Sequence, residues 1–285
     1  MAGNAWTWAG GQDPSPPAAS ASLCRGQPAR DRGKAAAIVR FNRPEQLNAI
    51  SWDTQRELGK ALQQAESDPS VRAVLITGRG RAFSAGGDIK AYARLQADTE
   101  AFTEFVDEYC QLTEGIRVMA KPVVALINGV CAAGGLELAL ACDFVWAAES
   151  ARIGDMHINF AQIGGAGALA RLPRAIGTAR ALELFFSGRI LNSAEALSWG
   201  IVNRVFPDES LLDEGIAFAR LVATKSPTAL HYMKKTVTAG AATDLRSALE
   251  LERDSALEYC LTLPDSMEGI HSFIEKRDSQ YGPLR

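Results

Sequence analysis

The sequence contains few histidines and cysteines, the residues that most often hold metal ions or form disulfides. Its three histidines, His157, His231 and His271, lie far apart and lack the spacing of metal ligands. Its five cysteines include no CxxC or CxxH pair, are odd in number and have apolar neighbours. These absences predict a protein without a metal site, whose thiols stay reduced as in the cytoplasm.

The chain also lacks a long apolar run and a large excess of charge of either sign. No segment is apolar over the length that a membrane-spanning helix needs. The 30 basic residues nearly balance the 33 acidic ones, and the net charge is −3. The sequence therefore predicts neither a membrane nor a nucleic acid partner. Its 47% apolar and 22% charged residues are typical of a soluble globular protein.

Residues 1–33 differ in composition from the rest of the chain. They are rich in Ala, Gly, Pro and Ser and lack the apolar core of a secretory signal. A transit peptide is the alternative, but arginine is sparse early in the segment, and Asp13 and Asp31 are acidic. We therefore expect residues 1–33 to form a disordered tail.

Strand patterns alternate with helix patterns from Lys34 onward, which predicts an α/β fold. Strands are predicted at 35–41, 71–77, 123–127 and 142–148, and the apolar runs at 71–77 and 142–148 are of the buried kind. Helices are predicted at 51–67, with Ser51 as the N-cap, and at 99–119 and 134–141. The remaining residues are expected to be mainly helical.

The expected domain boundary lies near Ser226-Pro227, where Pro227 is one of the prolines that interrupt the later part of the chain. It separates a core of residues 34–225 from a helical C-terminal region of residues 226–285. The core contains neither a Gly-x-Gly-x-x-Gly turn nor a Gly-Lys-Ser/Thr loop. The α/β pattern is therefore not that of a nucleotide-binding domain.

Two glycine-rich stretches, residues 83–88 and 128–137, each follow a strand pattern. Glycines let a backbone approach a ligand closely and present bare N–H groups. One N–H from each stretch could bind a single carbonyl oxygen that becomes negative during a reaction. Either stretch alone would be read as a turn between strand and helix. The pair, with Glu137 about one helical turn after Gly134, favours a catalytic site.

These stretches and several others resemble the enoyl-CoA hydratase/isomerase family, the crotonase superfamily, from about Ala35 to the C-terminus. The matching segments are 42–49, 83–90, 128–143, 161–173, 187–189, 194–202 and 275–277. The resemblance implies an α/β fold with a spiral core of ββα turns and a helical C-terminal trimerisation region. It also implies an acyl-CoA substrate and assembly into a homotrimer or a dimer of trimers.

The resemblance assigns catalytic roles to four positions. The N–H groups of Gly87 and Gly134 would hold the thioester oxygen, and Glu137 matches the first of two hydratase glutamates. Apolar neighbours on its helix predict burial and a raised pKa for Glu137. His157 occupies the place of the second glutamate. It is either a proton-transfer group or part of the pocket wall, while Asp155 would point elsewhere if the segment is extended.

The resemblance also implies backbone contacts to coenzyme A, which is part of the substrate, so no separate cofactor is expected. The matching positions lie in an early loop and beside the first glycine pair: Gln46, Leu47, Ala85, Asp88 and Ile89.

Glu45 stands where the family often has a lysine or arginine, which removes one phosphate contact. Arg43, Lys90 or a residue of another subunit is the expected replacement.

Hydration or isomerisation of a 2-enoyl thioester is the leading functional hypothesis. Another enolate reaction of the superfamily, such as acyl-CoA hydrolysis or decarboxylation, is an alternative that the fold does not exclude. A catalytically silent acyl-CoA binder would more plausibly have lost Glu137, which is present. An RNA-binding relative would have a lysine-rich helix, whereas residues 51–65 mix both signs of charge.

Overall fold

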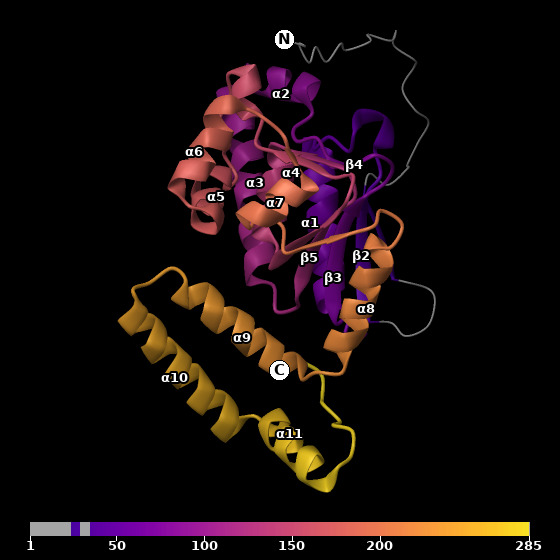
Figure 1. Cartoon of the computed structure of the whole chain (residues 1–285), viewed down its shortest axis with the longest axis vertical. Coiled ribbons are helices and arrows are strands. Elements are labelled where there is room, and N and C mark those ends of the chain that lie inside the picture. Colours follow the sequence, from indigo (N-terminus) through magenta and orange to yellow (C-terminus); the bar gives the residue numbers. More distant parts are fainter. Residues whose placement is uncertain (1–23, 29–34, 285) are drawn as a thin grey trace.

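The computed structural model describes residues 24–28 and 35–284, which form two sheets and surrounding helices (Figure 1). The six-stranded sheet has the order β1-β2-β3-β5-β7-β10, and the four-stranded sheet has the order β4-β6-β8-β9. The larger sheet contains β1 (Cys24–Pro28), β2 (Ala36–Phe41), β3 (Ala73–Gly78), β5 (Val123–Ile127), β7 (Phe144–Ala148) and β10 (Arg204–Phe206). The smaller sheet contains β4 (Ala82–Ser84), β6 (Val130–Ala132), β8 (Arg152–Gly154) and β9 (Leu191–Asn192).

The helices follow the strands in a repeating order. The N-terminal and central ones are α1 (Trp52–Ser67), α2 (Ile89–Leu95), α3 (Thr99–Val118), α4 (Gly134–Ala141), α5 (Ala168–Ile176) and α6 (Thr178–Ser187). The later ones are α7 (Ser193–Trp199), α8 (Leu211–Ala223), α9 (Pro227–Gly240), α10 (Leu245–Thr262) and α11 (Pro264–Glu275). Two short 3₁₀ helices are η1 (Pro44–Gln46) and η2 (His157–Phe160).

The chain alternates between the two sheets. The pairs β3/β4, β5/β6 and β7/β8 each place one strand in the larger sheet and the next in the smaller one. Helices follow these pairs, so the core is a spiral of ββα turns, and the predicted α/β fold is confirmed. The larger sheet is parallel except for β1, and the smaller is parallel except for β9.

One strand, β1, lies within the segment predicted as a disordered tail. It pairs antiparallel with β2, with Cys24 opposite Phe41. This pairing supplies partners to backbone groups of β2 that would otherwise lie at the sheet edge. Residues 1–23 and 29–33 of the predicted tail lie outside the described residues.

The central strands β3 and β5 are buried on both faces, as the apolar run at 71–77 predicted for β3. Val74 and Ile76 of β3 pack into one apolar cluster with α1, whereas Leu75 packs into a second cluster with α8. Ser51 caps α1, because its Oγ accepts a hydrogen bond from the Thr54 N–H at 3.3 Å. The predicted N-cap is therefore confirmed.

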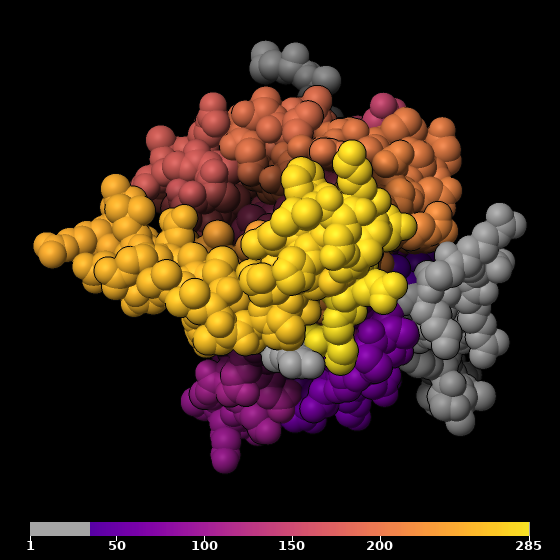
Figure 2. Space-filling view, turned by 90° about the horizontal axis from the view of Figure 1, so that it is seen from below, coloured from indigo at the N-terminus to yellow at the C-terminus, as the bar shows by residue number. Residues whose placement is uncertain are grey.

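The C-terminal helices α9, α10 and α11 project from the two-sheet body (Figure 1). Ser226 caps α9 at the predicted boundary, with its Oγ accepting from the Ala229 N–H at 3.0 Å. Lys234 ties α9 to the core through Asp143 at 3.0 Å and the carbonyl of Ile116 at 3.2 Å. Figure 2, which is seen from below relative to Figure 1, shows these helices in orange to yellow across that face.

None of the helices in the described ranges is long and apolar enough to cross a membrane.

Candidate active site

Three segments that follow neighbouring parallel strands meet at one edge of the smaller sheet. In the sheet β4, β6 and β8 are adjacent, with Ser84 opposite Cys131 and Cys131 opposite Ile153. Because the strands run in the same direction, the segments that leave their carboxyl ends emerge side by side. The first carries Gly87, the second carries Gly134 and Glu137, and the third carries His157. Strand pairing thus brings all four predicted catalytic positions to one edge.

The first two segments touch because Gly86 has no side chain. Its φ of +96° lies in the region that favours glycine. A Cβ at Gly86 would lie 2.7 Å from the Ala133 Cβ and 3.1 Å from the Gly134 nitrogen. A Cβ at Gly134 would lie 3.7 Å from the Gly87 nitrogen. The backbones of Gly87 and Gly134 are therefore immediate neighbours.

The N–H groups of both glycines donate to no acceptor among the described residues. The Gly86 carbonyl and the Asp88 N–H both bond to Ile50, so the Gly87 N–H points away from that bridge. Gly134 begins α4, where the first N–H groups have no carbonyl one turn back. The dipole of α4 adds positive potential at the same point. Together these groups can stabilise a developing negative oxygen.

Glu137 lies one turn into α4 and is only 3% exposed. Its Oε1 accepts hydrogen bonds from the Ala166 N–H at 2.7 Å and the Ala168 N–H at 3.3 Å. Its Oε2 accepts none from the residues that the structure describes. One oxygen is therefore held by the protein while the other is available to a ligand. Burial raises the pKa of Glu137 above its ordinary value, although His157 and the two N–H groups oppose the shift.

His157 faces Glu137 across Gly164. A Cβ at Gly164 would lie 2.9 Å from the Glu137 Oε1 and 3.3 Å from the His157 Cε1. The two side chains therefore lie against the same glycine. His157 therefore lies close to Glu137 and not on a distant part of a pocket wall.

Asp155 contacts His157 directly, contrary to the expectation for an extended segment. Met156 between them adopts a left-handed φ of +59°, and η2 begins at His157. This turn folds the Asp155 carboxylate back onto the imidazole, with Oδ2 at 3.0 Å from Nδ1. Burial acts to lower the pKa of His157, but Asp155, through its hydrogen bond and charge, and Glu137, through its charge, raise it above the ordinary value.

Comparison with known proteins identifies the family of the chain. A family model described as enoyl-CoA hydratase/isomerase matches residues 31–283. The chain belongs to this family. It is 37% identical over 246 residues to a probable enoyl-CoA hydratase of Bacillus subtilis, covering 86% of this chain and 94% of the relative. It is 34% identical over 247 residues to a crotonyl-CoA hydratase of Syntrophomonas wolfei, again covering 86% of this chain and 94% of the relative.

A solved structure shares the fold. The crystal structure of an enoyl-CoA hydratase from Bacillus anthracis superposes with a TM-score of 0.85 at 35% identity. The match covers 91% of this chain and 98% of that one. The crotonase-type fold implied by the sequence resemblance is therefore confirmed.

In this family member, the positions predicted to contact coenzyme A form one surface. The Ala85 N–H donates to the Leu47 carbonyl at 3.0 Å, which joins the early loop to the first glycine stretch. Gln46 is exposed at the end of η1. Asp88 caps α2, and Ile89 is 53% exposed. These five residues thus lie together beside Gly87.

The same loop shows that Arg43 is engaged within the protein. Its guanidinium pairs with Asp88 at 2.9 Å and donates to the Ala49 carbonyl at 2.8 Å. It therefore ties the early loop to the start of α2, which argues against Arg43 as the replacement phosphate ligand. Lys90 is exposed on α2, and its role in place of Glu45 stays a prediction.

Two buried residues that shape the site carry no signal in the sequence. The Tyr109 hydroxyl donates to the Gly134 carbonyl at 2.6 Å, and so holds the first turn of α4. Asn48 is fully buried, and its amide donates to the carbonyls of Arg79 and Ala82 at 3.0 and 2.7 Å. In a sequence, Tyr109 is typical of a core aromatic and Asn48 of a turn residue. Their partners are distant in sequence, so only the fold reveals them.

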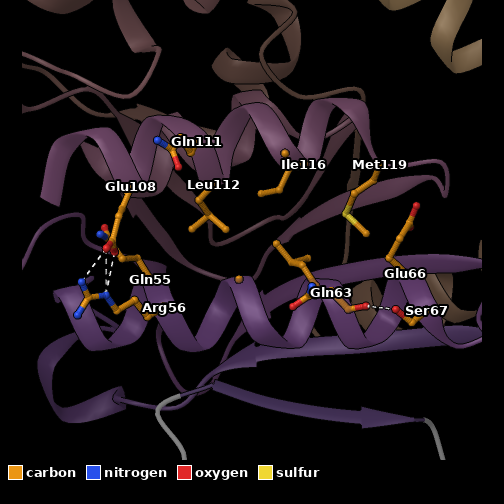
Figure 3. Close-up of a pocket in the computed structure, with 13 residues that line it drawn as sticks. Gln55, Arg56, Gln63, Glu66, Ser67, Glu108, Gln111, Leu112, Ile116 and Met119 are labelled. Carbon is orange, nitrogen blue, oxygen red and sulfur yellow. Dashed lines mark hydrogen bonds and ion pairs between the residues drawn. The ribbon is translucent and has the colours of Figure 1, made fainter. Parts of the chain in front are cut away.

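Another cavity lies between α1 and α3 and has a volume of about 450 Å³ (Figure 3). Gln63, Leu112 and Met119 are among the residues that line it, and an ion pair of Arg56 with Glu108 at 2.6 Å lies at one end. No predicted site residue lines this cavity. Within residues 35–284, no group of three or more His, Cys, Asp or Glu side chains could hold a metal ion.

The raised pKa of Glu137 predicts a pH-dependent effect of Glu137→Gln on stability. A raised pKa means that the contribution of Glu137 is fully present below its ordinary value of 4.5 and is lost as the pH rises through the raised value. Glutamine keeps an acceptor oxygen and does not ionise. We expect the difference between the Tm of Glu137→Gln and that of the wild type to rise in favour of the variant as the pH increases above 4.5.

Calorimetric or fluorescence melting curves measure this difference. The control is Glu214→Gln, an exposed glutamate on α8, for which the difference in Tm should not change with pH in this way. If the Tm of Glu137→Gln instead fell relative to that of the wild type as the pH rises, folding would not disfavour the ionised form of Glu137.

Proposed function

We propose that this enzyme acts on 2-enoyl thioesters of coenzyme A and hydrates them or shifts their double bond. The thioester oxygen lies against the N–H groups of Gly87 and Gly134, which stabilise the enolate form of the substrate. The observation that carries the proposal is the close approach of the Gly87 and Gly134 backbones, whose N–H groups donate to no described acceptor, at the start of the helix that carries Glu137. The names of the Bacillus subtilis and Syntrophomonas wolfei relatives support the same substrate class.

Glu137 and His157 each carry out one of the two proton transfers of the reaction. In hydration, Glu137 Oε2 takes a proton from water as its oxygen bonds to the β-carbon, and the thioester oxygen becomes an enolate oxygen. The His157 Nε2–H then gives a proton to the α-carbon, which restores the thioester. His157 thus takes the part that a second glutamate has in the hydratase pattern. Its raised pKa favours the protonated form that this step needs.

Coenzyme A is part of the substrate in this proposal and no separate cofactor takes part. Backbone groups of Gln46, Leu47, Ala85, Asp88 and Ile89 contact it. The adjacency of the early loop and the first glycine stretch supports this assignment, because both sides of the surface lie beside Gly87. The free thiols of Cys110, Cys131, Cys142 and Cys260 support a cytoplasmic location.

Hydrolysis of the thioester is the second candidate, and the contact of Asp155 with His157 is the observation that favours it. A neutral His157 could remove a proton from water, whose oxygen would then bond to the thioester carbonyl carbon. Coenzyme A thiolate would leave and take up a proton, giving a carboxylic acid. This reaction releases a free thiol, whereas hydration and isomerisation do not.

Turnover of a panel of acyl-CoA thioesters tests the proposal. We expect loss of the 2-enoyl thioester absorbance without release of thiol. Glu137→Gln should reduce turnover by about 10²–10⁴-fold, as for the removal of a general base, and should retain binding. The exposed Glu214→Gln serves as control and should keep wild-type turnover. Unchanged turnover of Glu137→Gln would remove Glu137 from the mechanism.

His157→Ala, measured on the same panel, separates the two interpretations of this histidine. We expect the hydration rate to fall by about 10²-fold or more, because His157 is the proposed proton donor to the α-carbon. His271→Ala, an exposed histidine on α11, is the control. A changed substrate preference with an intact limiting rate would make His157 part of the pocket wall. Release of thiol by the wild type would favour the hydrolase. Binding of acyl-CoA without any turnover would favour a catalytically silent binder.

Assembly into a trimer or a dimer of trimers is also part of the proposal. The 18 residues of α10 include none that is buried, and Leu261 and Phe273 are 79% and 85% exposed. Apolar surface of this extent on three consecutive helices is typical of a subunit interface. The Ser226-Pro227 junction would then divide the core from this region.

Sedimentation velocity tests the assembly. We expect wild type to sediment as a trimer or hexamer, and Phe273→Asp to shift the distribution to smaller species because a charge would enter the apolar interface. Arg220→Asp, at an exposed position on α8, is the control and should sediment as wild type. A monomeric wild type at micromolar concentration would contradict the proposed assembly.

A further inference from the structure

Asp155 is a buried carboxylate whose hydrogen bonds within the described chain both go to His157. Its side chain is 4% exposed, and that of His157 is 16% exposed. Oδ2 lies 3.0 Å from the His157 Nδ1, and Oδ1 accepts from the His157 N–H at 3.3 Å. A buried charge is costly unless it is paired, so this carboxylate depends on the imidazole for its partner.

The fold fixes this contact. Gly154, at the end of β8, accepts a hydrogen bond from the Ala133 N–H at 3.1 Å, which ties the segment to the turn that carries Gly134. The left-handed Met156 then reverses the chain, so that Asp155 and His157 meet. Asp155 and His157 are thus tied, through the backbone, to the turn that carries Gly134.

The contact determines which nitrogen of His157 can react. A carboxylate only accepts hydrogen bonds, so Nδ1 carries a proton toward Asp155. The Cε1 of the ring lies against Gly164, which also contacts Glu137. With Nδ1 occupied, Nε2 is the nitrogen left to exchange a proton with a substrate. The same logic applies to histidines that a carboxylate orients in other enzymes.

We propose that Asp155 is a positioning residue, which holds His157 with Nε2 as the proton-transferring atom and keeps that nitrogen protonated for the step at the α-carbon. The inference rests on the proposed function and adds to it a residue that acts through His157 without touching the substrate.

The charges around His157 define the expected pH dependence. The titratable groups that act on it are Asp155, on the preceding turn, and Glu137, on α4. Helix α6 meets η2 through the uncharged contact of Asn159 with the Gly188 carbonyl at 2.9 Å. Asp155, which bonds to the ring, and Glu137 both raise the pKa of His157. Removal of the Asp155 charge should therefore lower this pKa, so that the proton is lost at a lower pH.

Asp155→Asn tests the proposal, because asparagine keeps the shape and removes the charge. We expect kcat to fall at least tenfold with little change in KM, and the alkaline limb of the kcat profile to move to lower pH. If the contact of Asp155 with His157 were purely structural, Asp155→Asn would change Tm and leave the alkaline limb of the kcat profile in place. The control is Asp143→Asn, because the Asp143 carboxylate bonds to Lys234 on α9. This substitution should affect stability without moving the alkaline limb.

A double substitution tests whether Asp155 acts through His157. In the background of His157→Gln, Asp155→Asn should cause no further loss of kcat, because its target is already absent. A further tenfold loss in the double variant would overturn the inference and give Asp155 a separate role.

A measurement that needs no activity separates this inference from the proposed function. With ¹³Cε1-labelled histidine, the three histidines give three NMR signals, and the spectrum of His157→Gln assigns that of His157. The titration midpoint of His157 should fall to a lower pH in Asp155→Asn. An unchanged midpoint overturns the inference, whether or not the wild type hydrates enoyl thioesters. A lowered midpoint supports it even if the substrate panel points to another reaction.

Discussion

The parallel pairing of β4, β6 and β8 is the constraint on which the site depends. Each strand contributes only three residues, yet their register places three functional turns side by side. The close approach of Gly86 to Ala133 is possible only without a side chain, because a Cβ there would lie 2.7 Å from the Ala133 Cβ. A one-residue slip between β4 and β6 would displace Gly87 from Gly134 and Glu137, which share α4.

Burial makes the charges at this edge depend on one another. The low-dielectric surroundings of Glu137 raise its pKa and disfavour an isolated carboxylate. His157 lies within electrostatic reach and opposes that shift, while Asp155 and Glu137 raise the pKa of the imidazole. The carboxylate and the imidazole therefore support each other's charged forms. Such coupling is what the acid and base roles proposed for these two groups require.

Much of this arrangement could be predicted from the sequence. The buried strands of the larger sheet, the N-cap at Ser51 and the start of α4 at Gly134 follow from local patterns, and all match the structure. The resemblance supplied the spiral core, which the fold and the comparisons confirm. The three-residue strands β4, β6 and β8 were missed, because so short a segment has no measurable periodicity.

The contacts of Asp155 and Arg43 could not be predicted from sequence. The left-handed conformation of Met156, an unusual one for this residue type, brings Asp155 onto His157. Arg43 was one of three alternatives for the missing phosphate contact, but it pairs with Asp88, which is 45 residues away. Both contacts arise from tertiary structure, and no local pattern encodes them.

The most direct test of the account is the structure of the protein bound to an unreactive acyl-CoA analogue. We predict that the thioester oxygen lies within hydrogen-bonding distance, about 2.7–3.2 Å, of the nitrogens of both Gly87 and Gly134. The α-carbon and β-carbon should then lie between Glu137 Oε2 and His157 Nε2. An analogue bound with its thioester oxygen away from both glycine nitrogens would contradict the account.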